Sequence, residues 1–211
     1  MTHLDAQSLL LPRRRERIDR VVAARTRTLT LVLDGLRDPH NLSAILRTCE
    51  GFGIQEIHAV VSGRHGFRAT PRITQGAEKW IDLTYYRSMA ECAGALKGRG
   101  FLFCASDLAE GAEPLHALPL DRPLALVMGN EVDGVSDEAR QLADRRFTLP
   151  MLGFAQSYNV SVTAAVCVAL VRERKRQQGL VGDLTPTDAG ELRQRFYELA
   201  VKQGDKIFGE S

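Results

Sequence analysis

The chain has 211 residues, which fits one domain with extensions and is enough for a sizeable hydrophobic core. Its 44% apolar and 26% charged residues are typical of a globular protein, and no apolar run is long enough to span a membrane. The formal net charge of +2 excludes a generic polycation, so the distribution of charge matters more than its sum.

Basic residues gather in two places. Residues 12–28 carry seven arginines against two acidic residues, and residues 172–176 carry four basic residues around Glu173. Such patches attract phosphates and release counterions when nucleic acid binds. Charge alone gives equal weight to a second interpretation, two solvated helix faces.

Targeting and cysteine patterns indicate the compartment. The amino-terminal segment lacks a small-residue cleavage site after an apolar stretch, so we expect a cytoplasmic protein without a secretory signal. The cysteines form no Cys-x-x-Cys pair and lie in apolar stretches, which predicts buried free thiols. The histidines never pair at metal-ligand spacing, so no metal is expected.

In chain order, Pro12 and the spacing of Ile18, Val21 and Val22 predict an amphipathic helix over 12–25 with a basic face. Short apolar segments then alternate with helical patterns, which predicts an α/β fold with a parallel sheet and helices on both faces. The predicted strands are 28–35, 56–60, 101–106, 123–129 and 146–150, and the helices between them are 41–52, 88–98 and 137–143.

The remaining segments complete the predicted organisation. Residues 61–80 have no clean period and predict a long surface connection with at most one helical turn. Residues 159–179 predict a helix with a buried first half, and 185–204 a terminal helix that packs on another element. The expected domains are a basic helical extension at 1–27, a central domain at 28–179 and a helical extension at 180–211.

The common catalytic signatures are absent from the sequence. It contains no Gly-rich phosphate loop, no His-Glu-x-x-His and no Gly-x-Ser-x-Gly, which removes support for kinase-like, zinc-hydrolase and esterase interpretations. The Gly-x-Gly at 51–53 ends a predicted helix instead of opening one, so a dinucleotide-binding site is not expected.

A first unusual segment, residues 34–53, follows the first predicted strand. Asn41 stands at a predicted helix N-cap position, and Arg47 lies under two turns further on, near the carboxyl end of that strand. Ligands of open α/β sheets collect at this edge. A surface ion pair between Arg47 and Glu50 is an equally weighted alternative.

A second segment, residues 128–139, also follows a strand. Ser136 is predicted to cap the next helix, but capping does not account for Glu131, which lies in a loop between two glycines. The glutamate is expected to pair with a cation or to receive a hydrogen bond from a ligand. A calcium loop is disfavoured because the alternating oxygen ligands are missing.

The third segment, residues 148–165, places a polar quartet before an apolar helix: Gln156, Ser157, Tyr158 and Asn159. Polar groups that enter a buried helix need partners. Capping explains Ser157 or Asn159 but hardly both, so at least one side chain is expected to face a ligand. Backbone amides of residues 150–154 could read an adenine edge.

Together these segments contain N-L-S-A-I-L-R-T at 41–48, G-N-E-x-x-G-V-S at 129–136 and P-M-L-G-x-x-Q-S-x-N-V-S-V at 150–162. In this order the chain resembles the SPOUT superfamily of S-adenosylmethionine-dependent RNA methyltransferases. Within that superfamily it is similar to the tRNA (guanosine-2'-O)-methyltransferase, or TrmH, family. The resemblance runs from about Arg13 through the terminal helix.

The resemblance implies a parallel sheet whose carboxyl-terminal part forms a trefoil knot, S-adenosylmethionine held in the knot, and a homodimer. It implies an enzyme that methylates the ribose 2'-hydroxyl of a guanosine in tRNA, guanosine 18 of the D-loop. The implied catalytic residues are Arg47, Asn41, Glu131, Ser157 and Asn159, and the implied cofactor contacts are Ser106, Gly129, Leu149 and Tyr158. The implied RNA contacts are Arg17, Arg25, Arg172, Arg174, Lys175 and Arg176.

The role expected for Arg47 follows from its chemistry. A guanidinium has a pKa above about 12 and stays charged, so we expect Arg47 to hold and polarise the hydroxyl and its neighbouring phosphate. The chain departs from the family pattern at Phe154, Ala155 and Tyr158, where methionine, valine and leucine are more usual. These changes leave the polar residues assigned above in place.

Other functions remain as alternatives at this point. The same reaction on ribosomal RNA is the main rival, and the short segment before residue 28 favours tRNA over it. A non-catalytic RNA-binding module predicts a spoiled cofactor pocket or a lost Arg47, and the sequence shows neither. A purely structural interpretation of the motifs as turns and caps leaves Glu131 and Asn159 unexplained.

Overall fold

The computed structural model describes residues 6–61 and 74–208, with side chains described up to residue 201. The chain divides into two compact units, one formed by Met1–Thr26 with Val181–Ser211 and the other by Arg27–Leu180. Among the helices of the described ranges, none is both long and apolar enough to cross a membrane.

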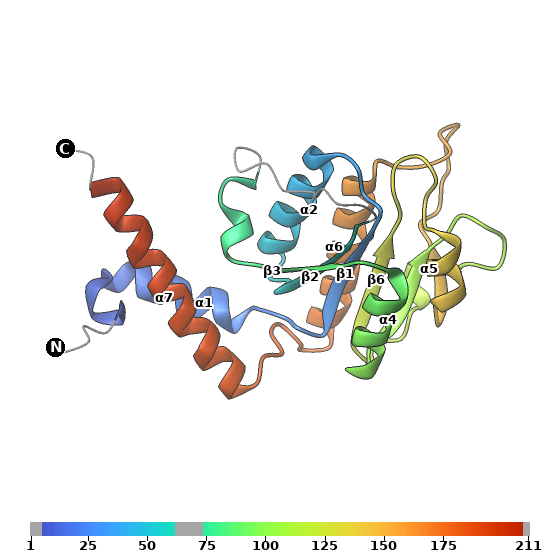
Figure 1. Ribbon diagram of the computed structural model, residues 1–211. Helices are drawn as coiled ribbons and strands as arrows, with labels where there is room; N and C mark the ends of the chain where they lie inside the picture. The colour runs from blue at the N-terminus through green and yellow to red at the C-terminus, as the bar shows by residue number, and fades with distance from the viewer. Residues whose placement is uncertain (1–5, 62–73, 209–211) are drawn as a thin grey trace. The chain divides into compact units, whose positions relative to one another are not determined.

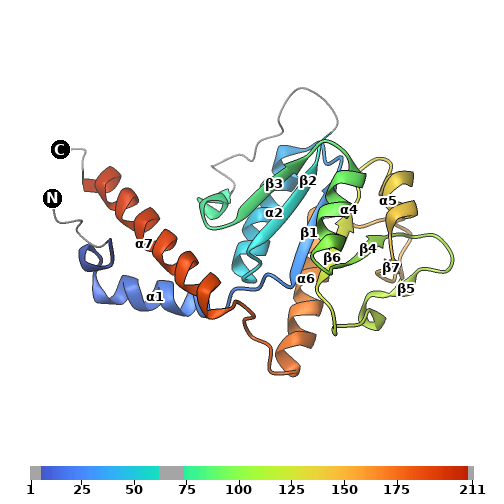
Figure 2. The ribbon, with the colours of Figure 1, turned by 60° about the horizontal axis from the view of Figure 1, so that its bottom comes forward.

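The larger unit is built on a seven-stranded sheet in which every neighbouring pair is parallel. The strand order is β3-β2-β1-β6-β4-β7-β5, and most of it can be followed in Figure 2. Strand β1 lies inside the sheet and is wholly buried, and its Leu31 pairs with Ile57 on one side and Leu126 on the other. The strands are β1 Leu29–Asp34, β2 Glu56–Val60, β3 Asp82–Tyr86, β4 Leu102–Ser106, β5 Glu113–Pro114, β6 Leu124–Met128 and β7 Arg145–Thr148.

Helices cover both faces of the sheet, as the α/β prediction requires. Figure 1 shows α2 (Pro39–Gly51) and α6 (Val160–Gln177) on one face and α4 (Met89–Gly98) and α5 (Asp137–Leu142) on the other. Each face has its own buried apolar cluster. Short 3-10 helices occur at η2 (Ala77–Lys79) and η3 (Leu115–Ala117).

The free cysteines are buried, as predicted: Cys49, Cys92, Cys104 and Cys167. Burial raises the pKa of Cys92, Cys104 and Cys167 to about 12, because a thiolate is poorly solvated in an apolar interior.

Two strands, β3 and β5, are not predicted from the sequence. Strand β3 lies at an edge of the sheet and is partly exposed, so its residues do not form the apolar run that marks a buried strand. Strand β5 has only two residues. Of the predicted connection at 61–80, residues 62–73 lie outside the described residues, and the remainder contains η2.

The first half of α6 is not buried all round, which corrects the expectation for residues 159–179. Val162, Val166 and Leu170 are 48%, 39% and 44% exposed and follow one another at intervals of four residues. The opposite side of the helix, including Ala164 and Val168, is fully buried against the sheet. An apolar stripe therefore faces away from the core of this chain.

The smaller unit consists of η1 (Ala6–Leu9), α1 (Pro12–Ala23) and α7 (Pro186–Phe208). Asp19 on α1 accepts hydrogen bonds from Arg193 Nε and Tyr197 Oη of α7, each at 2.8 Å. Arg25 lies over the ring of Phe196 at 5.5 Å. Both extensions of the chain thus contribute to one packed unit.

Candidate active site

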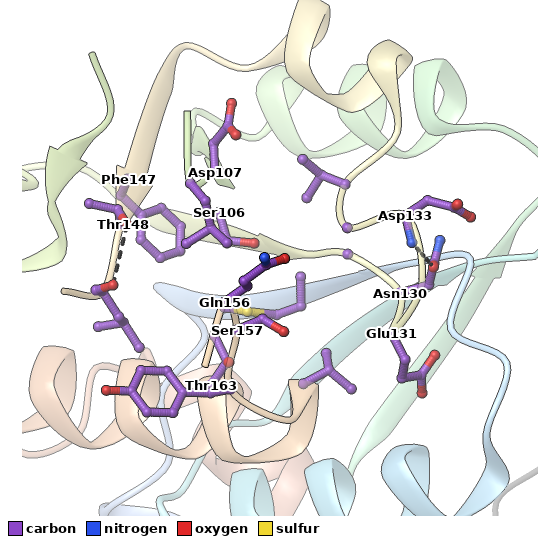
Figure 3. Close-up of a pocket in the computed structure, with 18 of the residues that line it drawn as sticks. Ser106, Asp107, Asn130, Glu131, Asp133, Phe147, Thr148, Gln156, Ser157 and Thr163 are labelled. Carbon is purple, nitrogen blue, oxygen red and sulfur yellow. Dashed lines mark hydrogen bonds between the residues drawn. The ribbon is translucent and has the colours of Figure 1, made fainter. Parts of the chain in front are cut away.

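A cavity of about 350 Å³ lies at the carboxyl edge of the sheet in the larger unit. The loops that follow β4, β6 and β7 line it, together with the first turn of α6 (Figure 3). Parallel strands end at a common edge, so residues far apart in the sequence meet there. Apolar side chains such as Met128, Phe147 and Leu149 line the cavity beside the polar Ser106 and Gln156.

The loop after β6 forms a tight turn that Asn130 stabilises. Its side-chain oxygen accepts hydrogen bonds from the amides of Val132 at 2.9 Å and Asp133 at 2.8 Å. The backbones of Asn130 and Gly134 also bond to each other in both directions. Glu131 is held at the tip of this turn.

Gly129 is required where the two ends of this loop cross. A Cβ atom built on Gly129 would lie 2.0 Å from the carbonyl carbon of Gly134 and 2.1 Å from the amide nitrogen of Val135. Both contacts are with backbone, which cannot move aside as a flexible side chain can. Any side chain at Gly129 would therefore displace the wall of the cavity.

A chain of hydrogen bonds joins the three motifs. Asn41 Nδ2 donates to Glu131 Oε1 at 2.6 Å, and Asn159 Nδ2 donates to Asn41 Oδ1 at 3.1 Å. Asn41 is not the N-cap of α2, because Asp38 fills that role through its bond with the His40 amide. Its place inside the first turn leaves the Asn41 side chain available to bridge Glu131 and Asn159.

Of the two residues that could cap α6, Ser157 and Asn159, the structure shows that Asn159 is the N-cap. Its side-chain oxygen accepts the Ser161 amide at 2.8 Å while its nitrogen binds Asn41, so one residue both caps the helix and joins the site. Ser157 is left in the lining of the cavity. Figure 3 shows Ser106, Gln156 and Ser157 close together in its middle.

A second set of contacts connects the loops after β1 and β6. The amide of Ser136 donates to Asp34 Oδ2 at 2.6 Å, and Ser136 itself caps α5 by accepting from the Ala139 amide, as predicted. Arg37 Nη2 lies 3.3 Å from Asp133 Oδ2. Nothing in the spacing of Arg37 and Asp133 along the sequence indicates this pairing, so neither residue could be predicted.

An ion cluster supports the wall formed by the loop after β4. The Asp107 carboxylate is 6% exposed and lies 3.3 Å from Arg146 and 3.7 Å from Arg140. Asp107 also accepts a hydrogen bond from the Ala109 amide at 3.1 Å. Asp107 and Arg140 both line the cavity, although neither is predicted as a site residue from the sequence.

Most of the site residues expected from the sequence converge on this cavity. Tyr158 is half-exposed, and its hydroxyl donates to the Pro150 carbonyl at 3.3 Å. Arg47 is exposed on α2 and is not among the lining residues. Arg47 is six residues beyond Asn41, which places the two side chains about 120° apart around the helix axis and explains the separation. The expected residues that line the cavity are Ser106, Gly129, Glu131, Leu149, Ser157 and Tyr158.

The expected RNA contacts separate into accessible and buried residues. Arg17 and Arg176 are exposed, whereas Arg172 and Arg174 are partly buried, and Arg174 donates to the Leu118 carbonyl at 2.9 Å. Arg176 forms an ion pair with Glu173 at 2.7 Å.

Two of these expectations need correction. Arg25 is 0% and Lys175 is 3% exposed, so neither side chain reaches the surface where a phosphate would lie. Arg25 stacks on Phe196, and the Lys175 ammonium donates to Thr28 Oγ1. Both cations therefore have internal partners in place of RNA.

A parallel sheet with a polar cavity built from the loops after β4, β6 and β7 defines this molecule as an α/β protein of the SPOUT fold, and the expected trefoil knot follows from that fold. The chain belongs to the SpoU rRNA Methylase family, whose model matches residues 28–169.

Individual relatives agree with this assignment. The chain is 41% identical to a tRNA (guanosine(18)-2'-O)-methyltransferase of Thermus thermophilus, over 79% of this chain and 86% of the relative. A crystal structure described as an A. aeolicus TrmH/SpoU tRNA modifying enzyme matches with a TM-score of 0.83 and 27% identity, over 90% of this chain and 97% of the other. An AdoMet-bound rRNA methyltransferase from Sinorhizobium meliloti matches with a TM-score of 0.65 and 25% identity, over 74% and 60%.

Proposed function

We propose that this protein methylates the ribose 2'-hydroxyl of guanosine 18 in the D-loop of tRNA, with S-adenosylmethionine as methyl donor. The observation that carries the proposal is the hydrogen-bonded chain Asn159–Asn41–Glu131, which ties the three motifs together beside the cavity. The name of the T. thermophilus relative and its match over most of both chains support tRNA as the substrate.

The cavity fits the proposed cofactor. Its volume of about 350 Å³ lies within the range of small-molecule sites, and apolar side chains that can cover an adenine alternate with polar groups that can fix its orientation. The AdoMet-bound relative supports the same use of this fold. We assign the cofactor contacts to Ser106, Gly129, Leu149 and Tyr158.

When bound, S-adenosylmethionine supplies a methyl group on a sulfonium, so the protein has to align the hydroxyl oxygen and exclude competing water. Asn41 and Asn159 fix one another and Glu131 through their hydrogen bonds. Ser157 and Glu131 then present polar atoms to the nucleotide from the wall of the cavity.

Arg47 holds and polarises the target hydroxyl and its neighbouring phosphate in this proposal. Its guanidinium is exposed and lies outside the cavity lining, so in this proposal Arg47 contacts the ribose and phosphate from outside the cavity once RNA is bound. A guanidinium stays protonated and supplies two parallel N–H donors, which suits a phosphate and a polarised hydroxyl.

The accessible basic residues supply the grip on tRNA. Arg17 on α1 and Arg176 at the end of α6 are exposed, and Arg172 and Arg174 lie partly at the surface. Such contacts are independent of sequence and weaken with salt. A protein acting on tRNA in this way belongs in the cytoplasm, which we propose as its location.

We propose further that the protein is a homodimer, with the α6 stripe of Val162, Val166 and Leu170 covered by a second copy. A soluble monomer gains nothing from three exposed apolar side chains in line, whereas two such stripes bury one another in a symmetric interface. Replacing Val166 with lysine should yield monomers, and light scattering after size-exclusion chromatography measures the change.

The alternative substrate is ribosomal RNA, which the description of the S. meliloti neighbour favours. One assay separates the two: purified protein is incubated with labelled S-adenosylmethionine and either unmodified tRNA or unmodified ribosomal RNA. Label at a D-loop guanosine whose 3' bond resists alkaline cleavage supports the proposal. Label only on ribosomal RNA, or on a base, refutes it.

A further inference from the structure

Arg37 lies at the rim of the cavity, in the loop that leads from β1 into α2. Its Nη2 atom is 3.3 Å from Asp133 Oδ2, and the two side chains are 67% and 63% exposed. Asp133 is one of the lining residues, and Figure 3 draws it at one edge of the cavity, well away from Ser106 and Phe147. The guanidinium is therefore at the cavity mouth and open to solvent.

The carboxylates around this mouth differ in what they hold. Asp34 accepts the Ser136 amide, Asp38 caps α2 through the His40 amide, and Glu131 accepts the Asn41 side chain. Asp133 differs from these three: within residues 6–61 and 74–208, its carboxylate pairs with Arg37 and accepts no other hydrogen bond. Removing the Asp133 charge thus costs the loops no other side-chain contact.

The ion pair between Arg37 and Asp133 contributes little to the stability of the fold. Both groups are about two-thirds exposed, and ion pairs in that setting contribute little because water solvates each partner well. A phosphate competes favourably for the same guanidinium, since it accepts two parallel N–H bonds from the arginine fork. In a 2'-hydroxyl methyltransferase, RNA phosphates flank the target ribose and must pass the cavity mouth.

We propose that Arg37 binds a backbone phosphate next to the target nucleotide, and that Asp133 occupies its guanidinium until the RNA displaces it. This inference rests on the proposed function, because it takes RNA as the ligand. The carboxylate keeps the arginine oriented at the mouth in the free protein and competes with the phosphate during binding.

The two partners then have opposite effects on RNA affinity. Arg37→Ala removes one phosphate contact, so it should weaken tRNA binding about fivefold to tenfold and reduce the salt slope by about one. Asp133→Asn removes the competing charge and the repulsion of the phosphate, so it should tighten binding about twofold to fivefold. A pair with a merely structural role would make both substitutions act in the same direction.

The test measures binding of an unmodified tRNA transcript to the full chain by fluorescence anisotropy, at several salt concentrations and with saturating S-adenosylhomocysteine. Arg122→Ala is the matched control. Arg122 is exposed, but it comes just before β6 and so lies at the amino ends of the strands, whereas the cavity lies at their carboxyl ends. Calorimetry with S-adenosylhomocysteine alone checks that each variant retains the cavity.

Weaker binding by Arg37→Ala with a smaller salt slope, together with tighter binding by Asp133→Asn, supports the proposal. Wild-type affinity in Arg37→Ala, or weaker binding in Asp133→Asn, overturns it while leaving the proposed function intact. Failure of the wild-type protein to bind or methylate tRNA overturns both.

Discussion

Asn41 Nδ2 donates a hydrogen bond to Glu131 Oε1 at 2.6 Å, across 90 positions of the sequence. The bond joins the first turn of α2 to the loop after β6, and Asn159 extends it to the start of α6. Three segments that are separate in the chain thus hold one another beside the cavity. The side chains of Asn41, Glu131 and Asn159 are therefore held in place by one another, and not by their own backbones alone.

The backbone of Gly134 and Val135 lies so close to Gly129 that we expect Gly129→Ala to abolish cofactor binding. The added methyl group would have to displace the backbone of Gly134 and Val135, at a cost of more than about 2 kcal/mol in stability. Calorimetric titration with S-adenosylhomocysteine and thermal unfolding measure both effects. Gly153→Ala is the control, since a Cβ there meets nothing within 4 Å, and equal behaviour of the two variants would contradict the account.

The turn that carries Glu131 predicts a difference between two substitutions of Asn130. Asn130→Ala loses the acceptor for the Val132 and Asp133 amides, so kcat should fall at least about tenfold as Glu131 loses its position. Asn130→Asp retains an oxygen that accepts both amides and should stay within about threefold of wild type. Steady-state kinetics of methyl transfer distinguish the two, and an equally poor Asp variant would be inconsistent with a turn-forming role.

Arg47→Lys should reduce kcat about 10²-fold or more while leaving the fold unchanged. A lysine keeps the charge but is a point donor, and it cannot supply two parallel N–H groups to hydroxyl and phosphate. Arg47 is exposed, so the replacement leaves the core packing unaltered. Near-normal turnover by this variant would show that the guanidinium fork has no role in the reaction.

Because His58 is buried, we expect the protein to lose stability as the pH falls. The side chain is 2% exposed in β2, and burial, reinforced by Arg99, lowers its pKa from 6.5 to about 4. Glu56 lies 3.9 Å away, but it is paired more closely with Arg99 at 2.8 Å. As pH falls, the unfolded chain binds the proton first, so stability declines from near pH 6.5 down to about pH 4.

Because of His58, the free energy of unfolding should fall by about 1 kcal/mol between pH 7 and pH 5.5. Chemical denaturation at both pH values measures the loss, and His58→Phe should reduce it by that amount because phenylalanine does not titrate. An unchanged pH dependence in the variant would mean that the pKa of His58 is the same in the folded and unfolded chain, and would contradict the prediction.

The sequence predicts those parts of the fold that periodicity determines. Strands β1 and β6 are buried on both faces and are mostly apolar in sequence, whereas the partly exposed edge strand β3 carries no such signal. Helix α6 shows the limit of this approach, because an apolar sequence does not reveal that Val166 faces away from the chain's own core.

The site was predictable only as a set of residue types. Spacing identified Glu131 and Asn159 as polar groups in need of partners, but it could not pair them with Asn41, since that pairing depends on how the sheet brings loops together. The basic clusters led to two wrong predictions of RNA contacts for a related reason. Arg25 and Lys175 belong to basic runs, yet the fold buries both against internal partners.

The most direct test of the central claim is a double-mutant cycle on Asn41→Ala and Glu131→Ala, read as kcat for methyl transfer to tRNA. If the three loops form one catalytic unit, each single variant should lose about 10²-fold and the double variant little more, because the second substitution removes a group already misplaced. Losses that multiply in the double variant, or single variants with wild-type turnover, would contradict the account.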